Sequence, residues 1–485
     1  MITFLICLSL LVGAYFVYGS YLDRKMGIDP NAPVPSQTHY DGVDYVPMPR
    51  WRIFLIQLLN IAGLGPVFGA VLGAAYGPVA FLWITLGGIF MGAMHDFIAG
   101  VISLKSNGQS LPEIIGNYLG SGTRAFMRIF SVFLMVLVGA VFMSQPAELV
   151  ASNISIPSLE VQAFSGMSWE LVAVLAVILV YYILATLLPI DKLIGRIYPL
   201  FGIALLVMAV SILYILLLHS DTYMIPELTS LENQIADSDK FPIVPMLFTT
   251  IACGAISGFH ATQSPMMARC MTSEKQSRSI FYGAMIAESI VALIWAAIGM
   301  AFWGGVDGLN AVIAEYGGSA AKMVDVITST TMGSVVAAFV LVGVVGCAIT
   351  SGDTAFRCAR LIVADIFGIE QKKLLKRVSV SLPLFAVALL IIFALPFQTI
   401  WSYFAWCNQT LAVITLWCIT VYLFRKGKPV VIAMIPALVM TYVCSSYIFI
   451  SPMMCGMENR MLAYILGAVL TLLIAAAVHV KAKGK

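Results

Sequence analysis

The chain has 485 residues, of which 60% are hydrophobic and only 11% are charged, and its formal net charge is +3. A soluble globular protein carries roughly 25% charged residues, so this composition excludes a water-soluble globule of such a size. Nearly uncharged runs recur along the whole chain, each close to the ~20 residues that cross a ~30 Å hydrocarbon core. The sequence therefore predicts an all-α, multi-pass membrane protein.

The apolar runs predict about 13 transmembrane helices in one membrane domain with short loops. The first run has no basic segment before it and no small-residue cleavage site after it, so we expect a retained helix and not a signal peptide. The predicted spans are residues 3–21, 52–75, 78–104, 124–145, 169–189, 193–218, 243–267, 279–303, 334–362, 378–396, 400–424, 429–450 and 460–480.

Basic residues are concentrated in every second loop, as with Arg24 and Lys25, and in the C-terminal tail, as with Lys481. The loops between them tend to be acidic, as with Asp237 and Asp239. Because cytoplasmic loops carry the excess of lysine and arginine, we expect the N-terminus outside and the C-terminus in the cytoplasm. The predicted location is a bacterial inner membrane.

Cysteine and histidine give no sign of a metal or of a cofactor. The nine cysteines are scattered, mostly inside apolar runs and without a C-x-x-C pair, and none of the five histidines forms H-x-x-x-H. This pattern fits neither a disulfide framework nor a zinc hydrolase. We predict no metal, apart from the alkali cation considered below, no cofactor and no nucleic-acid partner.

Two spans contain residues that interrupt helices. The second span holds Gly63-Leu64-Gly65-Pro66 in its middle. The glycines permit backbone angles outside the helical range, and the proline lacks the N–H group that a helix needs for its hydrogen bonds. The seventh span is weakened at Gly254, Ser257 and Gly258, and again at Pro265. The two segments lie five spans apart and so cross the membrane in opposite directions, as in an inverted repeat of five plus five helices.

Paired interrupted helices are a sequence sign of a transporter site. Freed carbonyl groups at a break can ligate a cation, and the N-terminus of a half-helix can hold a carboxylate. We therefore place substrate at Gly63, Gly65, Pro66, Ser257 and Gly258. The alternative is that these glycines only allow helices to pack closely.

Ionisable residues inside the spans cost roughly 2.5–3.5 kcal/mol each on insertion scales, so each needs a partner, a cavity or a function. His95 and Asp96 lie in the third span, and Glu288 lies in the eighth. We predict that they belong to an inner gate or to a network that couples transport to H⁺ or Na⁺. Static pairing inside the bundle is the alternative.

The ninth span carries Asp353 close to two hydroxyl residues, Thr350 and Ser351, and the sixth begins near Arg196. We predict that Asp353 and Arg196 also belong to the coupling or gating network. In the static alternative, Asp353 pairs with Arg357 or with Arg196. Two further basic residues are expected to be anchors at the cytoplasmic headgroups: Lys192 and Arg360.

Polar side chains near the second break complete the predicted substrate site. His260 and Gln263 follow Ser257, and Asn408 with Gln409 lies among aromatic residues of the eleventh span. A histidine in a broken segment suits carboxylate binding or proton coupling. Hydrogen bonds that only join helices are the alternative for all four side chains.

Six stretches, in this order, resemble the carbon starvation protein A family: GPVFGAVLGAAYGPVAFLWITLGGIFMGAMHDF, SLPEIIGNYLG, PIDKLIGRIYP, SGFHATQSP, TSGDTAFRCARL and YFAWCNQTLA. The resemblance runs from about residue 50 to about residue 425. It implies an APC-superfamily, LeuT-type arrangement of two inverted five-helix repeats. It also implies peptide utilisation during carbon starvation, and pyruvate uptake by proton symport.

Under this resemblance, residues 51–425 form the core, with repeats at about 51–218 and 243–425, and extra helices lie within 1–50 and 426–485. By analogy with sodium-coupled members of the fold, Thr350 and Ser351 sit where a hydroxyl pair faces the first broken helix. The resemblance favours protons and leaves Na⁺ at these two residues as the alternative.

The predicted function is that of a non-enzymatic secondary active transporter, in particular a proton-coupled importer of peptides, pyruvate or both. A Na⁺-coupled carboxylate symporter and a nutrient sensor with a transporter fold are the alternatives. An intramembrane protease built on Ser257 and His260 lacks any sign of an oriented base or an oxyanion hole. A channel would show a repeated filter element or charged rings, and the sequence has neither.

Overall fold

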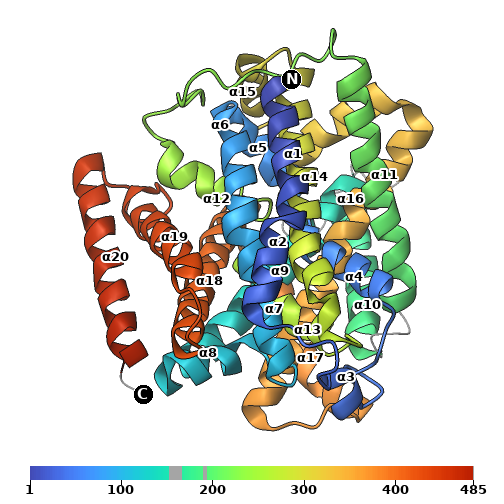
Figure 1. Cartoon of the computed structure of the whole chain (residues 1–485). Coiled ribbons are helices and arrows are strands. Elements are labelled where there is room, and N and C mark those ends of the chain that lie inside the picture. The colour runs from blue at the N-terminus through green and yellow to red at the C-terminus, as the bar shows by residue number, and fades with distance from the viewer. Residues whose placement is uncertain (152–166, 189–193, 484–485) are drawn as a thin grey trace.

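A computed structural model describes residues 1–151, 167–188 and 194–483, without the side chains of 194–197, 333–341 and 398. Throughout these ranges every regular segment is a helix, and no strand occurs. The helices form one bundle with the N-terminus at one end and the C-terminus at the other (Figure 1). Opposite ends agree with an odd number of membrane crossings.

The helices of the N-terminal half run from the chain start to the loop before the second break. They are α1 Ile2–Phe16, α2 Tyr18–Met26, α3 Pro35–Thr38, α4 Arg50–Ala62, η1 Gly65–Gly69, α5 Ala70–Gly73, η2 Ala74–Tyr76, α6 Val79–Leu82, η3 Trp83–Gly92, α7 Ala93–Lys105, α8 Leu111–Leu119, α9 Ser121–Ala151, α10 Trp169–Leu187 and α11 Ile194–Leu218.

The helices of the C-terminal half begin with the short pieces of the second broken span. They are η5 Ile243–Leu247, α12 Phe248–Thr250, α13 Gly258–Ala268, η6 Glu274–Gln276, η7 Arg278–Tyr282, α14 Gly283–Phe302, α15 Val306–Glu315, α16 Ala320–Phe367, α17 Leu374–Ala394, α18 Phe397–Arg425, α19 Val431–Ile450 and α20 Arg460–Lys483. Long helices pack side by side, as α9 does along α16, and α18 does along α19.

In the described part of the chain, ten helices are long and apolar enough to cross a membrane, or eleven when the bent pair at residues 50–76 counts as one span. Two predicted spans are not among them. Span 243–267 is divided into short pieces, and span 334–362 lies in α16, partly among side chains that are not described. The count of thirteen and the inverted repeat remain predictions.

The predicted break in the second span is confirmed. α4 ends at Ala62, a new helical segment begins at Gly65, and the two parts are bent by 53°. Gly63 between them has φ +39°, a conformation that an L-residue with a side chain rarely adopts. Pro66 follows at the start of the new segment, where its missing N–H is tolerated.

The seventh span also breaks, at the predicted Gly254 and Ser257. The chain leaves the helical path at Ile251 and starts α13 at Gly258. The further interruption predicted at Pro265 is wrong, because this residue lies inside α13. Membrane helices tolerate proline, and α13 continues through Pro265 to Ala268.

The two breaks lie directly against each other. A Cβ atom added to Gly65 would overlap the side chain of Cys253, and one added to Gly69 would lie 2.8 Å from the Thr250 carbonyl oxygen. Segments far apart in the sequence thus approach to backbone distance, which only glycine permits. Helix α14 packs against α4, η1 and α5, so it supports the first broken span along its length.

This contact predicts the effect of adding one methyl group. Gly65→Ala forces Cys253 to move and should destabilise the folded protein by about 1–3 kcal/mol, the usual cost of overpacking a filled interior. The measurement is denaturant unfolding in mild detergent. Gly122→Ala is the matched control, because a Cβ at Gly122 meets no atom within 4 Å.

A double variant shows whether Gly65→Ala lowers stability through its clash with Cys253 or through a change in backbone conformation. Only the Cβ and Sγ atoms of Cys253 lie too close to the added methyl group, and the Cα atom is at 3.6 Å. Gly65→Ala combined with Cys253→Gly should therefore recover most of the lost stability. Failure of the double variant to recover any stability would contradict the packing explanation.

Candidate functional site

Four of the predicted coupling and substrate residues form one buried chain of contacts. His95 Nδ1 lies 2.8 Å from Asp96 Oδ1, and His260 Nδ1 lies 2.9 Å from Asp96 Oδ2. On its other side, His260 Nε2 lies 3.5 Å from Glu288 Oε2. All four residues are fully buried. The fold therefore joins three elements, α7, α13 and α14, through the side chain of Asp96 and the imidazole of His260.

Cys253 completes this cluster, and sequence reasoning missed it. Its Sγ atom, a ring nitrogen of His260 and a carboxylate oxygen of Glu288 all lie within 4.8 Å of one another. Cys253 sits inside the second break, next to Gly254, and this position was the available signal. We name Cys253, His260 and Glu288 the break cluster.

Side chains from α18 satisfy the backbone at the second break. Asn408 Oδ1 accepts the backbone N–H of Phe259 at 2.7 Å, and Asn408 Nδ2 donates to Ser257 Oγ at 2.9 Å. Gln409 Nε2 donates to the Ile256 carbonyl at 3.1 Å. Because the first N–H groups of a helix have no partner within it, Asn408 acts as a cap for α13. Substrate contact by Asn408 and Gln409 remains a prediction.

The first break is joined to α16 by a predicted hydroxyl. Ser351 Oγ donates to the Leu59 carbonyl at 2.9 Å and to the Asn60 carbonyl at 3.2 Å. Thr350 behaves differently, since its Oγ1 donates to the Cys347 carbonyl of its own helix. One member of the predicted hydroxyl pair therefore faces the first broken helix.

Two amides of α4 were not singled out from the sequence although they interrupt an apolar run. Gln57 and Asn60 are fully buried, and no side-chain atom of either has a hydrogen-bond partner among the described residues. Unsatisfied buried amides are costly, so they mark a place where polar ligand atoms would be accommodated.

Among the described side chains, Asp353 is bound by a tyrosine and pairs with no arginine. The Tyr198 hydroxyl donates to Asp353 Oδ1 and also to the Thr350 carbonyl, at 3.0 Å in the second case. The alternative pairing of Asp353 with Arg357 is wrong, because Arg357 pairs elsewhere. Arg196, the other suggested partner, has a side chain outside the described residues.

The partner of Arg357 is Asp44, a loop residue that the sequence did not single out. Arg357 Nη1 lies 3.0 Å from Asp44 Oδ1, and Arg360 Nη2 lies 3.3 Å from the same oxygen. Arg360 is fully buried, so its predicted role as a headgroup anchor is wrong. The similarly expected Lys192 lies outside the described residues.

The charge of Asp44 is maintained by its neighbours. Burial acts to raise the pKa of Asp44, but the guanidinium groups of Arg360, Arg357 and Arg269 outweigh it and hold this pKa below its ordinary value. Asp44 belongs to the loop between α2 and α4, at the end of the bundle that carries α3 and α17 (Figure 1). The loop is thus tied to α16 by a buried ionic cluster.

A cavity of about 410 Å³ lies against both broken spans on the side of the bundle opposite the Asp44 cluster. It is lined by Tyr76 at the end of the first broken span and by Thr250 directly before the second break, with Asn310 of α15 and Trp401 of α18. A second cavity of about 140 Å³ shares Trp401 and reaches Phe68. We name these two spaces the vestibule. Figure 1 shows α15 at the same end of the bundle as the N-terminus.

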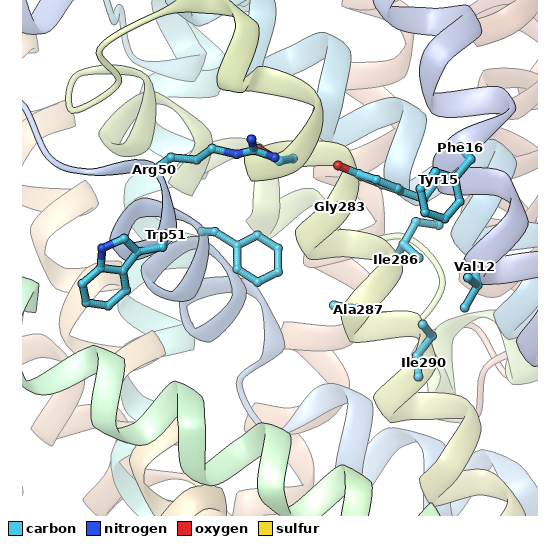
Figure 2. Close-up of a pocket in the computed structure, with 11 residues that line it drawn as sticks. Val12, Tyr15, Phe16, Arg50, Trp51, Gly283, Ile286, Ala287 and Ile290 are labelled. Atoms are coloured by element: carbon cyan, nitrogen blue, oxygen red, sulfur yellow. The ribbon is translucent and has the colours of Figure 1, made fainter.

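A larger groove of about 490 Å³ lies on a different surface, between α1, the start of α4 and α14 (Figure 2). Its lining is apolar, apart from Arg50 and Ser279, which are joined by a 2.8 Å hydrogen bond. Exposed apolar side chains such as Phe16 and Trp51 border it, as expected where a protein meets lipid tails. It contains none of the predicted site residues.

The remaining predicted residues are buried beside the same breaks. Gln263 Nε2 donates to Thr262 Oγ1 at 3.1 Å, and Gly258 packs on the backbone of Asn408 and Ala412. The arrangement as a whole, two broken spans with buried polar groups and a vestibule above them, defines a polytopic membrane protein of the transporter class.

The chain belongs to the carbon starvation protein CstA family, whose model matches residues 1–164, 149–332 and 308–446. A Haemophilus influenzae relative named only as an uncharacterized membrane protein is 43% identical over 340 residues, which cover 62% of this chain and 91% of the relative. The family model matches from residue 1 to residue 446, so the similarity is longer than the stretch from about 50 to about 425 that contains the six motifs.

Two named relatives come from Escherichia coli. The pyruvate/proton symporter BtsT is 29% identical over 59% of this chain and 47% of its own length. The peptide transporter CstA is 27% identical over 60% of this chain and 48% of its own length. The matched part of this chain thus spans about half the length of these curated transporters.

The Asp44 cluster predicts a large effect on stability. Asp44→Asn leaves buried arginine charges without their counter-ion and should destabilise the protein by about 3–5 kcal/mol. Because the pKa of Asp44 is lowered in the fold, this contribution is present above the ordinary carboxyl value of about 4 and is lost as pH falls through the lower folded value. Denaturant unfolding in detergent between pH 3 and about 8 measures both effects.

Glu370→Gln is the control, since Glu370 is an exposed acid in the loop that follows α16. This variant should stay within about 0.5 kcal/mol of the parent. Equal stability of the Asp44→Asn and Glu370→Gln proteins would contradict the proposed importance of the buried ion pairs.

Proposed function

We propose that this protein is a proton-coupled secondary transporter that imports a small carboxylate substrate, pyruvate or a short peptide, through an inner membrane. The names of the family relatives support a transporter and, for BtsT, proton symport with pyruvate. The proposed orientation has the N-terminus outside and the C-terminus in the cytoplasm, from the placement of basic loops. Transport by the core at residues 51–425 requires no enzymatic step.

The observation that carries this proposal is the meeting of the two broken spans. Non-helical backbone inside a membrane is tolerated only where it is buried in protein or lines a cavity. At both breaks in this protein, side chains of α16 and α18 already bond to the freed backbone groups, through Ser351 and Asn408. Discontinuous helices that face each other in this way are the usual site of substrate and ion binding in transporters.

The two ends of the bundle suggest how access alternates. The vestibule lies next to Tyr76 and Thr250 at one end, and the Asp44 cluster joins the α2–α4 loop to α16 at the other. In our proposal, substrate enters through the vestibule and binds between the breaks. The Asp44 ion pairs then separate to release it into the cytoplasm.

Asp353 is the residue that we propose for proton coupling. It is buried on α16, it accepts a hydrogen bond from Tyr198, and it takes part in no ion pair among the described side chains. A carboxyl group without a fixed cation can change its protonation state during a transport cycle. Ser351, two residues before Asp353 on the same helix, bonds to the first broken span, so the proposed coupling residue lies close to that break along α16.

Asp353→Asn should abolish substrate accumulation driven by a pH gradient, because asparagine keeps the shape of the side chain but carries no exchangeable carboxyl proton. The measurement is uptake of labelled substrate into proteoliposomes, with the protein's elution in size-exclusion chromatography as the folding check. Asp325→Asn on the same helix is the control and should accumulate substrate normally. Normal accumulation by Asp353→Asn would remove this residue from coupling.

The substrate class is tested by substrate-induced proton movement in proteoliposomes. Pyruvate, a dipeptide and a tripeptide are added separately, and the external pH is recorded. Alkalinisation by pyruvate alone identifies a monocarboxylate symporter, and alkalinisation by peptides alone identifies a peptide importer. No pH change with any of them, together with uptake that persists, would contradict proton coupling.

Sodium coupling is the second candidate, and the geometry of Ser351 favours it specifically. Its hydroxyl group and the carbonyl oxygens of Leu59 and Asn60 are close together at the first break, and oxygen atoms are the ligands of hard cations. Uptake that follows an imposed Na⁺ gradient and is lost in Ser351→Ala would identify this mechanism. Thr350→Ala is the matched control, because Thr350 Oγ1 bonds within its own helix.

A further inference from the structure

We propose that the break cluster, Cys253, His260 and Glu288, binds a divalent metal ion of the Zn²⁺ type between the second break and α14. The proposal concerns binding and is independent of which substrate or coupling ion the protein uses. Sequence spacing gave no such indication, because Cys253 and His260 are seven residues apart in the seventh span and Glu288 lies in another span. The argument rests on ligand chemistry, geometry and unsatisfied atoms.

The three side chains present the donor set that such an ion prefers. A thiolate, an imidazole nitrogen and a carboxylate oxygen are ligands of Zn²⁺ and of related divalent ions. Their donor atoms lie within 4.8 Å of one another, and all three residues are buried. In a tetrahedral site with bonds of roughly 2.0–2.3 Å, ligands are separated by about 3.4–3.8 Å. Closing the site requires side-chain shifts of about 1 Å.

Unsatisfied atoms point into this space. Neither carboxylate oxygen of Glu288 accepts a hydrogen bond from the described residues, and His260 Nε2 is likewise without a hydrogen-bond partner there. The ion-pair separation of 3.5 Å between His260 and Glu288 is longer than a hydrogen bond. Buried polar atoms without partners are rare and require an explanation, and a shared ion would satisfy all of them together.

The orientation of His260 has the form found at metal sites. Its Nδ1 atom lies 2.9 Å from Asp96 Oδ2, which leaves Nε2 directed at Glu288. A metal-binding histidine almost always donates its other N–H to a carboxylate or a carbonyl oxygen, and this fixes the tautomer and the ring. His95 in turn contacts the second oxygen of Asp96 at 2.8 Å. Asp96 is therefore a positioning residue of the proposed site.

The charge of the ligands and the position of the site also fit a divalent cation. A thiolate and a carboxylate together neutralise a divalent cation, so a closed site adds no net charge to a buried region. Three protein ligands leave a fourth position that a water molecule or a substrate carboxylate can take. Since Gly65 packs on Cys253, the ion would also fix the contact between the two breaks.

The test uses the full-length protein, purified in detergent after removal of any affinity tag and incubated with Co²⁺. Cobalt replaces zinc in such sites and gives visible absorption together with a sulfur-to-metal charge-transfer band when a thiolate is bound. We expect one tightly held metal per chain, measured by mass spectrometry, and a charge-transfer band. Cys253→Ser should lose the band, and Glu288→Gln should bind cobalt more weakly.

Controls separate this site from adventitious binding and from misfolding. Cys418→Ser replaces another buried cysteine and should keep both the band and the stoichiometry. Asp96→Asn should weaken binding by about 10–100-fold while the thiolate band remains at saturating cobalt. Size-exclusion chromatography confirms that each variant is folded. A band that persists in folded Cys253→Ser, or a wild-type protein that binds no metal, would overturn the proposal.

Discussion

The close contact between the two interrupted spans is the constraint on which the other features depend. Gly65 allows the first break to rest on the side chain of Cys253, and Gly69 allows it to approach the Thr250 carbonyl group. A larger residue at either position would push the two segments apart and disturb the place where Ser351 and Asn408 bond to the freed backbone groups. The close packing of the two broken spans therefore keeps the polar groups at the breaks buried inside the protein.

Around this contact, the protein distributes polar groups into three separate regions with different chemistry. The break cluster joins α13 and α14 to the second break, whereas Ser351 and Asp353 connect α16 to the first break and to α11. Asp44 with its two arginines lies farther along α16. One long helix, α16, thus contacts both the centre and one end of the bundle, and in the proposed cycle it would link binding to release.

Membership in the CstA family is read from the sequence and agrees with this architecture, but the family includes relatives named for peptide and for pyruvate transport. Both substrates carry a carboxylate, so the same half-helix and amide groups could serve either one. The two cavities of the vestibule share Trp401, and the smaller one is also lined by Phe68 and Glu148. In the proposed function, the size and the charged lining of this space would together decide between the two substrates.

The sequence by itself determined the membrane class, the family and both helix breaks, because these follow from local properties: hydrophobic length, motif order, and glycine or proline within an apolar run. It also identified His95, Asp96, Glu288 and Asp353 as polar residues that need partners. Only the tertiary structure decided which partners they have. Cys253, Tyr198 and Asp44 look ordinary in their own segments, because their partners, such as Asp353 for Tyr198 and Arg357 for Asp44, lie on distant segments.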